Sequence, residues 1–582
     1  MKPGVSRERA AARLNVIGKQ IQRTTGPQMT ERDLFLLRDG RQGFESKQEQ
    51  FGRPVLLLML LVAVVLLVAC ANLAALLLVR SVERAREAGV RLALGASRAA
   101  VVRQFLTESL MLAVAGGVAG WGLAHVLVNV LLNLLGPQGV GLARHVQADW
   151  NVFTFSAALT LAAGALFGAL PAWRASRIDP LSAIRGVARG LSSRTSLSRT
   201  LIAGQVALSL ALLFGAGLFA KSLRNLRAID LGLQPENVVL MHIDLTGSAR
   251  GGAAAGQFFQ ELLERARAMP ETRMASLANL SVLSGAMQST VVRLPDHVPN
   301  RLMPVTNFVS ATSGYFRTLG IPVLAGRDFT SVDHPGTSGE GTAIVNEQFA
   351  IAYLGGEALD KVFGYGGGRK VRVAGIAGTA RFRYLREEPQ PVMYLPVNRE
   401  QFPQSLHLQV RTSADPVAMM GRLRGLVREM DARLPLDRIT TMEMQIDQAL
   451  SRERMLAFLS TALGGVALAL AAIGIYGALS FSVARRTREI GIRTAVGAPR
   501  GRIAGLFVGD SARTVAAGIA AGIPLALGCG KLASTLLYGL EPQDAGTATA
   551  ATALLIAATL AAALLPAWRA ARLDAMKALR HD

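Results

Sequence analysis

Long runs without a charged residue recur along this chain and constrain its fold more than any other feature. The uncharged runs cover residues 55–79, 150–173, 200–220, 455–484 and 545–568. Two further runs, residues 104–135 and 503–540, are longer, Gly-rich and interrupted by a few polar residues. About 20 mostly apolar residues suffice to cross the hydrocarbon core of a bilayer as a helix. We therefore expect an α-helical integral membrane protein with seven spans in a lipid bilayer.

Arginines between these runs predict how the spans are oriented. Six arginines follow each of the first, third and fifth spans, whereas residues 136–149 carry one and residues 541–544 none. An excess of Lys and Arg marks cytoplasmic loops. We expect these arginines at the cytoplasmic face of a multi-pass protein in the bacterial inner membrane. The net charge of +23 then follows from membrane topology, and nucleic acid is not an expected partner.

This orientation places residues 223–453 outside the cytoplasm as one domain of ordinary size. Its residue pattern differs from that of the spans. Strand-like alternation is found at residues 342–346, 370–377 and 406–411, and amphipathic helical spacing at residues 347–354 and 415–434. We therefore expect an α/β domain between the fourth and fifth spans.

Internal similarity indicates a duplication. Residues 83–98 and 485–500 share nine of 16 positions at a constant offset of 402. Residues 171–185 and 566–580 share nine of 15 positions at an offset of 395. Both pairs lie on the expected cytoplasmic side, so the two copies of a three-span unit are parallel repeats.

The repeat predicts the domain organisation. We expect a remnant of a first outer domain (1–53), a first three-span unit (54–190), a single helix (199–222), an outer α/β domain (223–453) and a second three-span unit (454–582). By symmetry, a first span and most of a first outer domain are missing from this sequence. We expect a misassigned start or a fragment, with a genuine short form as the alternative.

Each copy predicts a short amphipathic helix between its first two spans, on the cytoplasmic side. In the first copy Glu87 and Arg91 share one face, Leu94 belongs to an apolar one, and Gly95 suits the helix end. In the second copy Pro499 suits the first turn of the next helix. Two interpretations stay open: an anchor on lipid headgroups, or a docking knob for a cytosolic protein.

Several polar side chains lie within the spans. Glu108 and Asp510 occupy equivalent positions, and Arg513 is close enough in sequence to pair with Asp510. For both acids we expect a structural role at the interface. For Asn72 and His125 the expectation is packing or hydrogen bonding between helices.

Motifs for catalysis are absent from the sequence. The nearest match to the phosphate-binding loop G-x-x-x-x-G-K-[ST] is residues 215–222, where Ala220 replaces the required Gly. There is no H-E-x-x-H, no G-x-S-x-G and no cluster among the seven histidines. Cys70 and Cys529 lie in apolar runs and read as small core residues. We therefore expect no catalytic residue, metal site or cofactor, and no enzyme.

The repeated motifs resemble a known family. The sequence R-E-I-G-I-R-T-A-V-G-A-P-R at 488–500, with P-A-W-R-A at 566–570, is similar to the FtsX-like permease domain of MacB-type ABC transporters. Residues 314–321, 324–329 and 343–347 resemble the MacB-like periplasmic core domain. The duplicated layout is similar to the large orphan permeases of Acidobacteria. The resemblance spans nearly the whole chain.

This resemblance implies a permease subunit that couples a separate cytosolic ABC ATPase to a shape change in the periplasmic domain, for export or efflux. A periplasmic adaptor or a second permease copy is a further possible partner. In the family, the helix after the second span of each four-span unit contacts the ATPase. The matching positions here are Arg86, Glu87, Gly89, Arg91, Gly95 and Ala96, and in the second copy Arg488, Glu489, Gly491, Arg493, Gly497 and Ala498.

Two other functions stay open at this point. An FtsX-like protein can regulate periplasmic cell-wall hydrolases without transporting anything. A secondary transporter is disfavoured, because the repeats are parallel and few charges lie within the spans.

Overall fold

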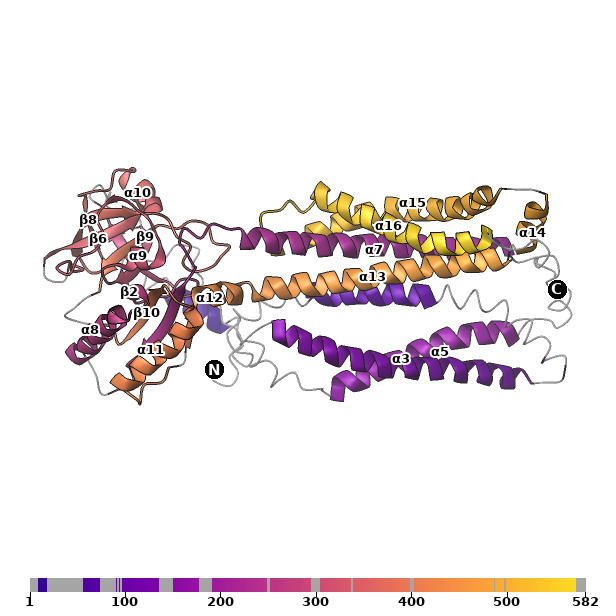
Figure 1. The fold of residues 1–582 in the computed structure, drawn as a ribbon, viewed down its shortest axis with the longest axis horizontal. Helices are drawn as coiled ribbons and strands as arrows, with labels where there is room; N and C mark the ends of the chain where they lie inside the picture. The colour runs from indigo at the N-terminus through magenta and orange to yellow at the C-terminus, as the bar shows by residue number, and fades with distance from the viewer. Residues whose placement is uncertain are drawn as a thin grey trace. The chain divides into compact units, whose positions relative to one another are not determined.

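The computed structural model describes most of the chain, in two compact units (Figure 1). The described residues are 9–17, 56–73, 91, 94, 97–134, 150–176, 191–248, 252–294, 304–336, 339–397, 402–436, 438–485, 487–496 and 499–571. One unit contains Ala228–Leu450, and the other contains Lys47–Arg227 and Ser451–Asp582. We call the first the α/β unit and the second the helical unit.

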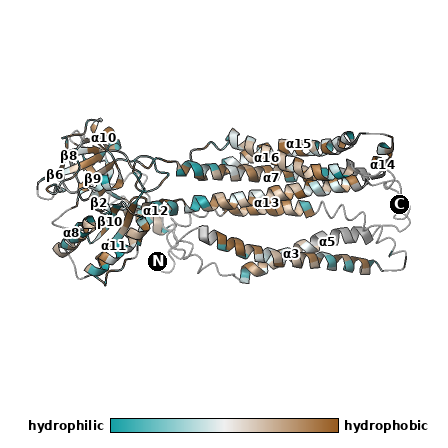
Figure 2. Ribbon diagram, viewed as in Figure 1, coloured by the Kyte–Doolittle hydropathy of each residue, from teal (hydrophilic) through white to brown (hydrophobic). Residues whose placement is uncertain are grey.

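The helical unit consists of long apolar helices, which appear brown in Figure 2. Its helices are Leu56–Leu73, α3 (Arg98–Leu134), α5 (Trp150–Ser176), α7 (Leu191–Arg227), α13 (Ser451–Arg485), α14 (Thr487–Ala495), α15 (Arg500–Ala533), the 3-10 turn η2 (Ser534–Leu536) and α16 (Ala545–Ala571). A helix satisfies its own backbone hydrogen bonds, which is what a chain crossing lipid requires.

Six helices in the described part of the chain are long and apolar enough to cross a membrane. They are Leu56–Leu73, Arg98–Val130, Arg199–Arg227, Ser451–Val483, Val508–Leu536 and Ala545–Ala570. Each lies at a span expected from the sequence. The remaining expected span, residues 150–173, falls in α5, where Trp150–Ala165 forms a shorter apolar helix.

Helix α7 packs against α13, α15 and α16. Small residues allow the close approach to α15: a Cβ built on Gly518 would lie 2.7 Å from the carbonyl oxygen of Ala203, and one on Gly522 would lie 2.9 Å from the Cα of Ala207. Small residues at helix contacts are typical of membrane proteins, because they let two backbones come together. The pair α3 and α5 is packed similarly, with Gly164 against Ala113.

The α/β unit contains one sheet of eleven strands. The strands are β1 (Val238–Asp244), β2 (Thr272–Ala278), β3 (Gln288–Arg293), β4 (Val305–Ala311), β5 (Val323–Gly326), β6 (Glu340–Asn346), β7 (Val362–Tyr365), β8 (Arg369–Ala377), β9 (Val392–Pro396), β10 (Ser405–Thr412) and β11 (Arg438–Thr441). Its helices are α8 (Ala253–Ala268), α9 (Tyr315–Leu319), α10 (Glu347–Leu354), α11 (Pro416–Met430) and α12 (Met442–Ala449).

The strand order is β11-β1-β10-β2-β4-β3-β7-β8-β6-β9, with β5 beside β8. Strand β9 also pairs in parallel with β4, so β4, β3, β7, β8, β6 and β9 form a closed ring. Helix α10 packs with the ring, where Phe349 is fully buried beside Phe363.

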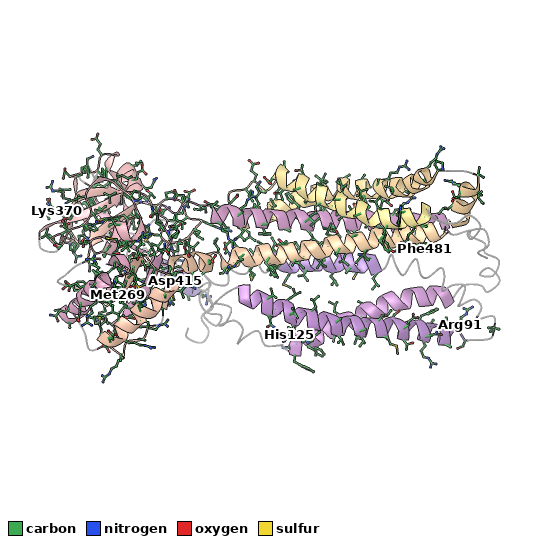
Figure 3. All side chains as sticks on the ribbon, viewed as in Figure 1. Arg91, His125, Met269, Lys370, Asp415 and Phe481 are labelled. Atoms are coloured by element: carbon green, nitrogen blue, oxygen red, sulfur yellow. The ribbon has the colours of Figure 1, made fainter. Side chains whose placement is uncertain are left out.

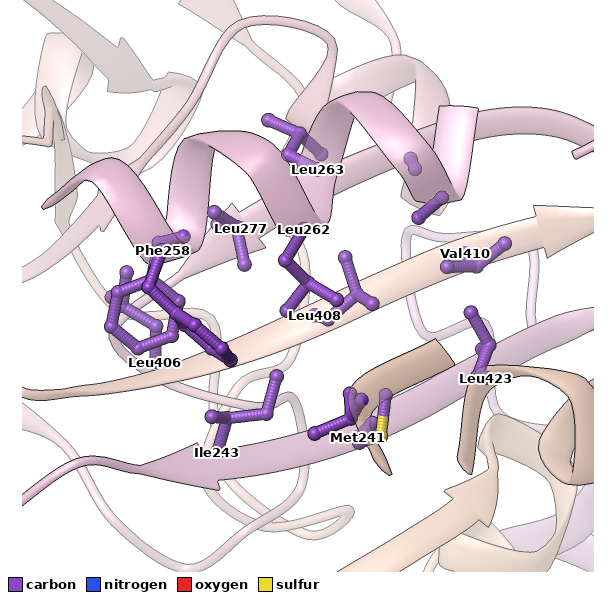
Figure 4. Close-up of a cluster of buried hydrophobic side chains, with 14 of the residues drawn as sticks. Met241, Ile243, Phe258, Leu262, Leu263, Leu277, Leu406, Leu408, Val410 and Leu423 are labelled. Carbon is purple, nitrogen blue, oxygen red and sulfur yellow. The ribbon is translucent and has the colours of Figure 1, made fainter. Parts of the chain in front are cut away.

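A second core forms where α8 and α11 cover β1, β10 and β2 (Figure 4). The buried residues of α8 include Phe258, Leu262 and Ala266, which recur every four residues and so share one face. They pack with Met241 and Leu408 from the sheet.

The five segments expected in this unit are confirmed. Strands β6, β8 and β10 cover the three alternating segments, and α10 covers the expected helix at residues 347–354. Helix α11 ends at Met430, four residues before the expected boundary. It begins where the Asp415 side chain accepts a hydrogen bond from the backbone N–H of Val417, a typical N-cap.

Candidate functional site: a cytoplasmic coupling surface

Helix α14 carries most of the described residues of the expected coupling surface. Ile490 is buried in the core of the helical unit, at 3% exposure, and fixes the helix on that core. Ile492 and Val496 lie on another face and are 50% and 83% exposed. Two apolar side chains four residues apart form a continuous patch on a helix. The helix therefore combines a buried anchor with an exposed apolar patch.

Charged side chains lie beside this patch. The Arg493 guanidinium contacts the Glu489 carboxylate at 2.6 Å, one helical turn apart, and both side chains are about half exposed. An exposed pair of this kind adds about 0.3–0.5 kcal/mol to helix stability. The pair therefore shapes the surface more than it stabilises the fold. Arg488 and Gly491 also belong to α14.

In the first copy the described part of this surface is smaller. Leu94 is 82% exposed. Arg91 Nη1 donates a hydrogen bond to Gln104 Oε1 at 2.8 Å, which ties the segment to α3 (Figure 3). Leu94 and Val496 are equivalent at the offset of 402, so an exposed apolar residue recurs in both copies. The expected site positions Arg86, Glu87, Gly89, Gly95, Ala96, Gly497 and Ala498 lie outside the described residues.

The sequence-based site included the charged and glycine positions but missed Ile492, Val496 and Leu94. Their signal was present, because apolar residues spaced four apart recur in two arginine-rich segments. What the sequence could not show was which apolar side chains are buried. Ile490 and Ile492 differ in exposure although they are two residues apart.

Helix α7 is held by an ion pair near each end. Arg199 Nη2 donates to both carboxylate oxygens of Asp510 on α15, at 2.9 and 2.6 Å. The expectation that Arg513 pairs with Asp510 is replaced by this contact. At the other end Lys221 Nζ lies 2.8 Å from Asp544 Oδ1, just before α16. Hydrogen bonds from Lys221 and from Thr547 lower the pKa of Asp544 to about 2, so this carboxylate stays charged.

Buried polar groups join three helices in the helical unit. Asn72 Nδ2 and Gln205 Nε2 both donate to the carbonyl oxygen of Leu470 on α13, at 2.7 and 2.8 Å. Ser209 donates to the carbonyl of Ala467 at 3.2 Å. The expected role of Asn72 in hydrogen bonding between helices is confirmed. His125 is exposed on α3 (Figure 3).

Titratable groups of the α/β unit serve its structure. Asp333 is almost fully buried, yet hydrogen bonds from Arg327 at 2.7 and 2.9 Å and from Thr330 and Thr342 outweigh that burial and hold its pKa well below the ordinary value. Burial, with nearby His242 and Arg438, lowers the pKa of His407 to about 4. Among the described residues no group of three His, Cys, Asp or Glu side chains could hold a metal ion.

Comparison with family models identifies the chain. The model for the FtsX-like permease C-terminal domain matches residues 59–180 and 461–575. The model for the MacB-like periplasmic core domain matches residues 200–426. The chain belongs to the family of MacB/FtsX-type ABC transporter permeases. The α/β unit supplies most of the periplasmic core domain of this permease.

Curated relatives match this permease over limited stretches. The pyoverdine export ATP-binding/permease protein PvdT of Pseudomonas fluorescens strain Pf0-1 is 36% identical over 163 residues, which cover 26% of this chain and 24% of PvdT. The macrolide export ATP-binding/permease protein MacB of Nitrobacter winogradskyi is 34% identical over 155 residues, 26% of this chain and 23% of MacB. The permease thus spans about a quarter of the length of these relatives.

Two solved structures are similar to part of the permease. The extracellular domain of the ABC-type transporter YknZ from Gram-positive bacteria has a TM-score of 0.24 and 16% identity, over 35% of this chain and 98% of that one. The periplasmic region of MacB from Actinobacillus actinomycetemcomitans has a TM-score of 0.26 and 14% identity, over 38% of this chain and 95% of that one.

Proposed function

We propose that this chain is the permease subunit of an ABC exporter and is driven by a separate cytosolic ATPase. The matching relatives are named as export ATP-binding/permease proteins. This sequence contains no phosphate-binding loop, so in the proposal the ATPase is another chain. The observation that carries the proposal is the exposed apolar patch on α14, anchored by Ile490 and matched by Leu94 in the first copy.

The proposed architecture is two parallel three-span units with seven spans in total. Matches of one family model to residues 59–180 and 461–575 support the duplication, and the constant offset of 402 supports a common register. The proposed boundaries are residues 54–190, 199–222, 223–453 and 454–582, with residues 1–53 belonging to a first outer domain. The arginine-rich segments face the cytoplasm of the inner membrane, and residues 223–453 lie in the periplasm.

The proposed mechanism is mechanical. A push on α14 reaches the helical core through Ile490, which packs in the same cluster as residues of α7, α13 and α16. The ion pairs of Arg199 and Lys221 keep α7 in register with α15 and α16. Helices α7 and α13 lead by direct chain connection to β1 and from α12, so they would deliver the movement to the outer domain.

Association with an ATPase tests this proposal. The full chain is tagged and purified from membranes, and a co-purifying protein with a G-x-x-x-x-G-K-[ST] loop is identified by mass spectrometry. Replacing the exposed apolar residue by Val496→Asp is expected to reduce recovery of the ATPase at least tenfold. Reversing the charges of Glu489 and Arg493 together is expected to act in the same direction.

The matched control is Val417→Asp, which places the same charge at a half-exposed valine of the α/β unit. It is expected to leave ATPase recovery unchanged. Retained association of the Val496→Asp variant contradicts the coupling surface. Capture of a cell-wall hydrolase by the wild-type chain, without any ATPase, would favour a regulator over an exporter.

A further inference from the structure

The Leu56–Leu73 helix buries two residues among those described, Val68 at 0% exposure and Asn72 at 4%. They are four residues apart, so they lie on one face of the helix. The rest of this helix is exposed or half-buried within the chain. Its contact with the helical unit therefore passes through this short face.

Asn72 meets its own equivalent in the other copy. The offset of 402 relates Asn72 to Gly474 and Val68 to Leu470, both on α13. The Asn72 amide donates to the Leu470 carbonyl at 2.7 Å. A Cβ built on Gly474 would lie 2.3 Å from Asn72 Oδ1, so the amide rests directly on the glycine backbone.

A contact between equivalent positions is the signature of a two-fold interface. In such an interface residue i contacts j and j contacts i, and residues at the axis contact their own equivalents. Here the two partners belong to one chain. The two permease units thus meet about an internal pseudo-two-fold axis that passes near Asn72 and Gly474.

The two residues at this axis are unequal, and the inequality carries the inference. Two asparagines here would collide, because even a Cβ at position 474 overlaps the Asn72 side chain. Two glycines would leave a gap and lose the hydrogen bond to Leu470. Gln205 of α7, which is 3% exposed, also lies within 2.8 Å of the Cβ position of Gly474 and limits the space further.

We propose that the Asn72–Gly474 pair makes the two permease units of one chain each other's partner and selects against pairing with a second copy of the chain through this face. The proposal rests on the duplicated architecture proposed above. One chain would then supply both halves of the membrane part, and a second permease copy would not be needed there.

Disulfide trapping in the full chain tests the pairing. Cys70→Ala and Cys529→Ala remove the native thiols, and Asn72→Cys with Gly474→Cys introduces a pair. Oxidation in membranes is expected to give a reducible species of altered mobility at monomer mass. A reducible species at twice that mass would overturn the proposal.

Single substitutions give the control for self-pairing. In a two-fold homodimer through the first unit, Asn72→Cys alone would bring two introduced thiols together and give a disulfide-linked dimer. We expect no such dimer, and its appearance counts against the inference. Because this readout involves no ATPase, loss of ATPase binding with intact trapping would affect only the proposed function.

A residue swap tests the complementarity itself. Gly474→Asn alone places two amides at the axis and is expected to lower the melting temperature of the detergent-solubilised chain. Adding Asn72→Gly restores one large and one small residue and is expected to recover most of that loss. A double variant as unstable as Gly474→Asn would contradict the complementarity.

Discussion

Arg199 and Asp510 form an ion pair between α7 and α15, although 311 positions separate them in the sequence. Asp510 has a nearer candidate, Arg513, on its own helix. The structure nevertheless places the Arg199 guanidinium on both oxygens of the carboxylate. The pair therefore reports on helix packing, which gives it a specific test.

A double-mutant cycle should show coupling between Arg199 and Asp510. Both side chains are about half exposed, so an energy of about 0.5–1 kcal/mol is expected from Arg199→Ala and Asp510→Ala. The measurement is thermal unfolding of the full chain in detergent. Arg513→Ala serves as the control, with no coupling to Asp510→Ala expected. Coupling to Arg513 in place of Arg199 would show that the α7–α15 contact is wrong.

Equivalent glycines of the two copies should respond differently to enlargement. A Cβ on Gly522 would lie 2.9 Å from Ala207, whereas nothing lies within 4 Å of the Cβ position of Gly120. Gly522→Leu is therefore expected to separate α15 from α7 and destabilise the chain by about 1–3 kcal/mol. Gly120→Leu, at the position related by the offset of 402, is the matched control. Equal losses in both variants would refute the difference in packing.

Acidification should weaken the α/β unit through His407. Its pKa is about 4 in the folded protein, below the ordinary 6.5, because burial and the neighbours His242 and Arg438 disfavour the charged ring. The unfolded chain takes up this proton at a higher pH than the folded one. Stability is therefore lost as pH falls from about 6.5 to about 4, by roughly 3 kcal/mol at most.

The variant His407→Gln removes the titrating ring and should flatten this part of the pH profile. The readout is limited proteolysis of residues 228–450 in the full-length protein during heating, at pH 7 and pH 4.5. An unchanged pH dependence in the variant would assign the acid sensitivity to another group.

Removing the carboxylate of Asp333 should destabilise the same unit. Asp333 is 4% exposed and accepts hydrogen bonds from Arg327, Thr330 and Thr342. Asp333→Ala leaves these donors unsatisfied and is expected to cost about 3–5 kcal/mol, as for other broken buried pairs. Urea unfolding measures the loss. Thr342→Val, which removes one of the donors, should cost less, and the reverse order would contradict this account.

Local patterns predicted the parts of the fold that local residues determine. Strand β10 and helix α10 follow from alternation and helical spacing within eight residues each. The closed ring does not, because the pairing of β4 with β9 joins segments more than 80 residues apart through backbone groups that every sequence shares. Such pairings depend on the tertiary packing of both strands.

The site shows the same division. The sequence predicted Glu489 and Arg493 because charges one helical turn apart are visible in it. Ile492 could not be separated from Ile490, because both are isoleucines and only packing against the other helices decides which is buried. The partner of Asp510 was mistaken for the same reason: the nearest arginine in sequence is not the nearest in space.

The central position of α7 has a consequence for biogenesis. Its partners on α13, α15 and α16 are translated much later: Leu470, which accepts a hydrogen bond from Gln205, follows 265 residues downstream. The ribosome therefore delivers α7 into the bilayer with Gln205, Arg199 and Lys221 still unmatched. Insertion of this helix must be completed by late-arriving segments, so a ribosome that stops before residue 451 leaves an orphan helix for quality-control proteases to find.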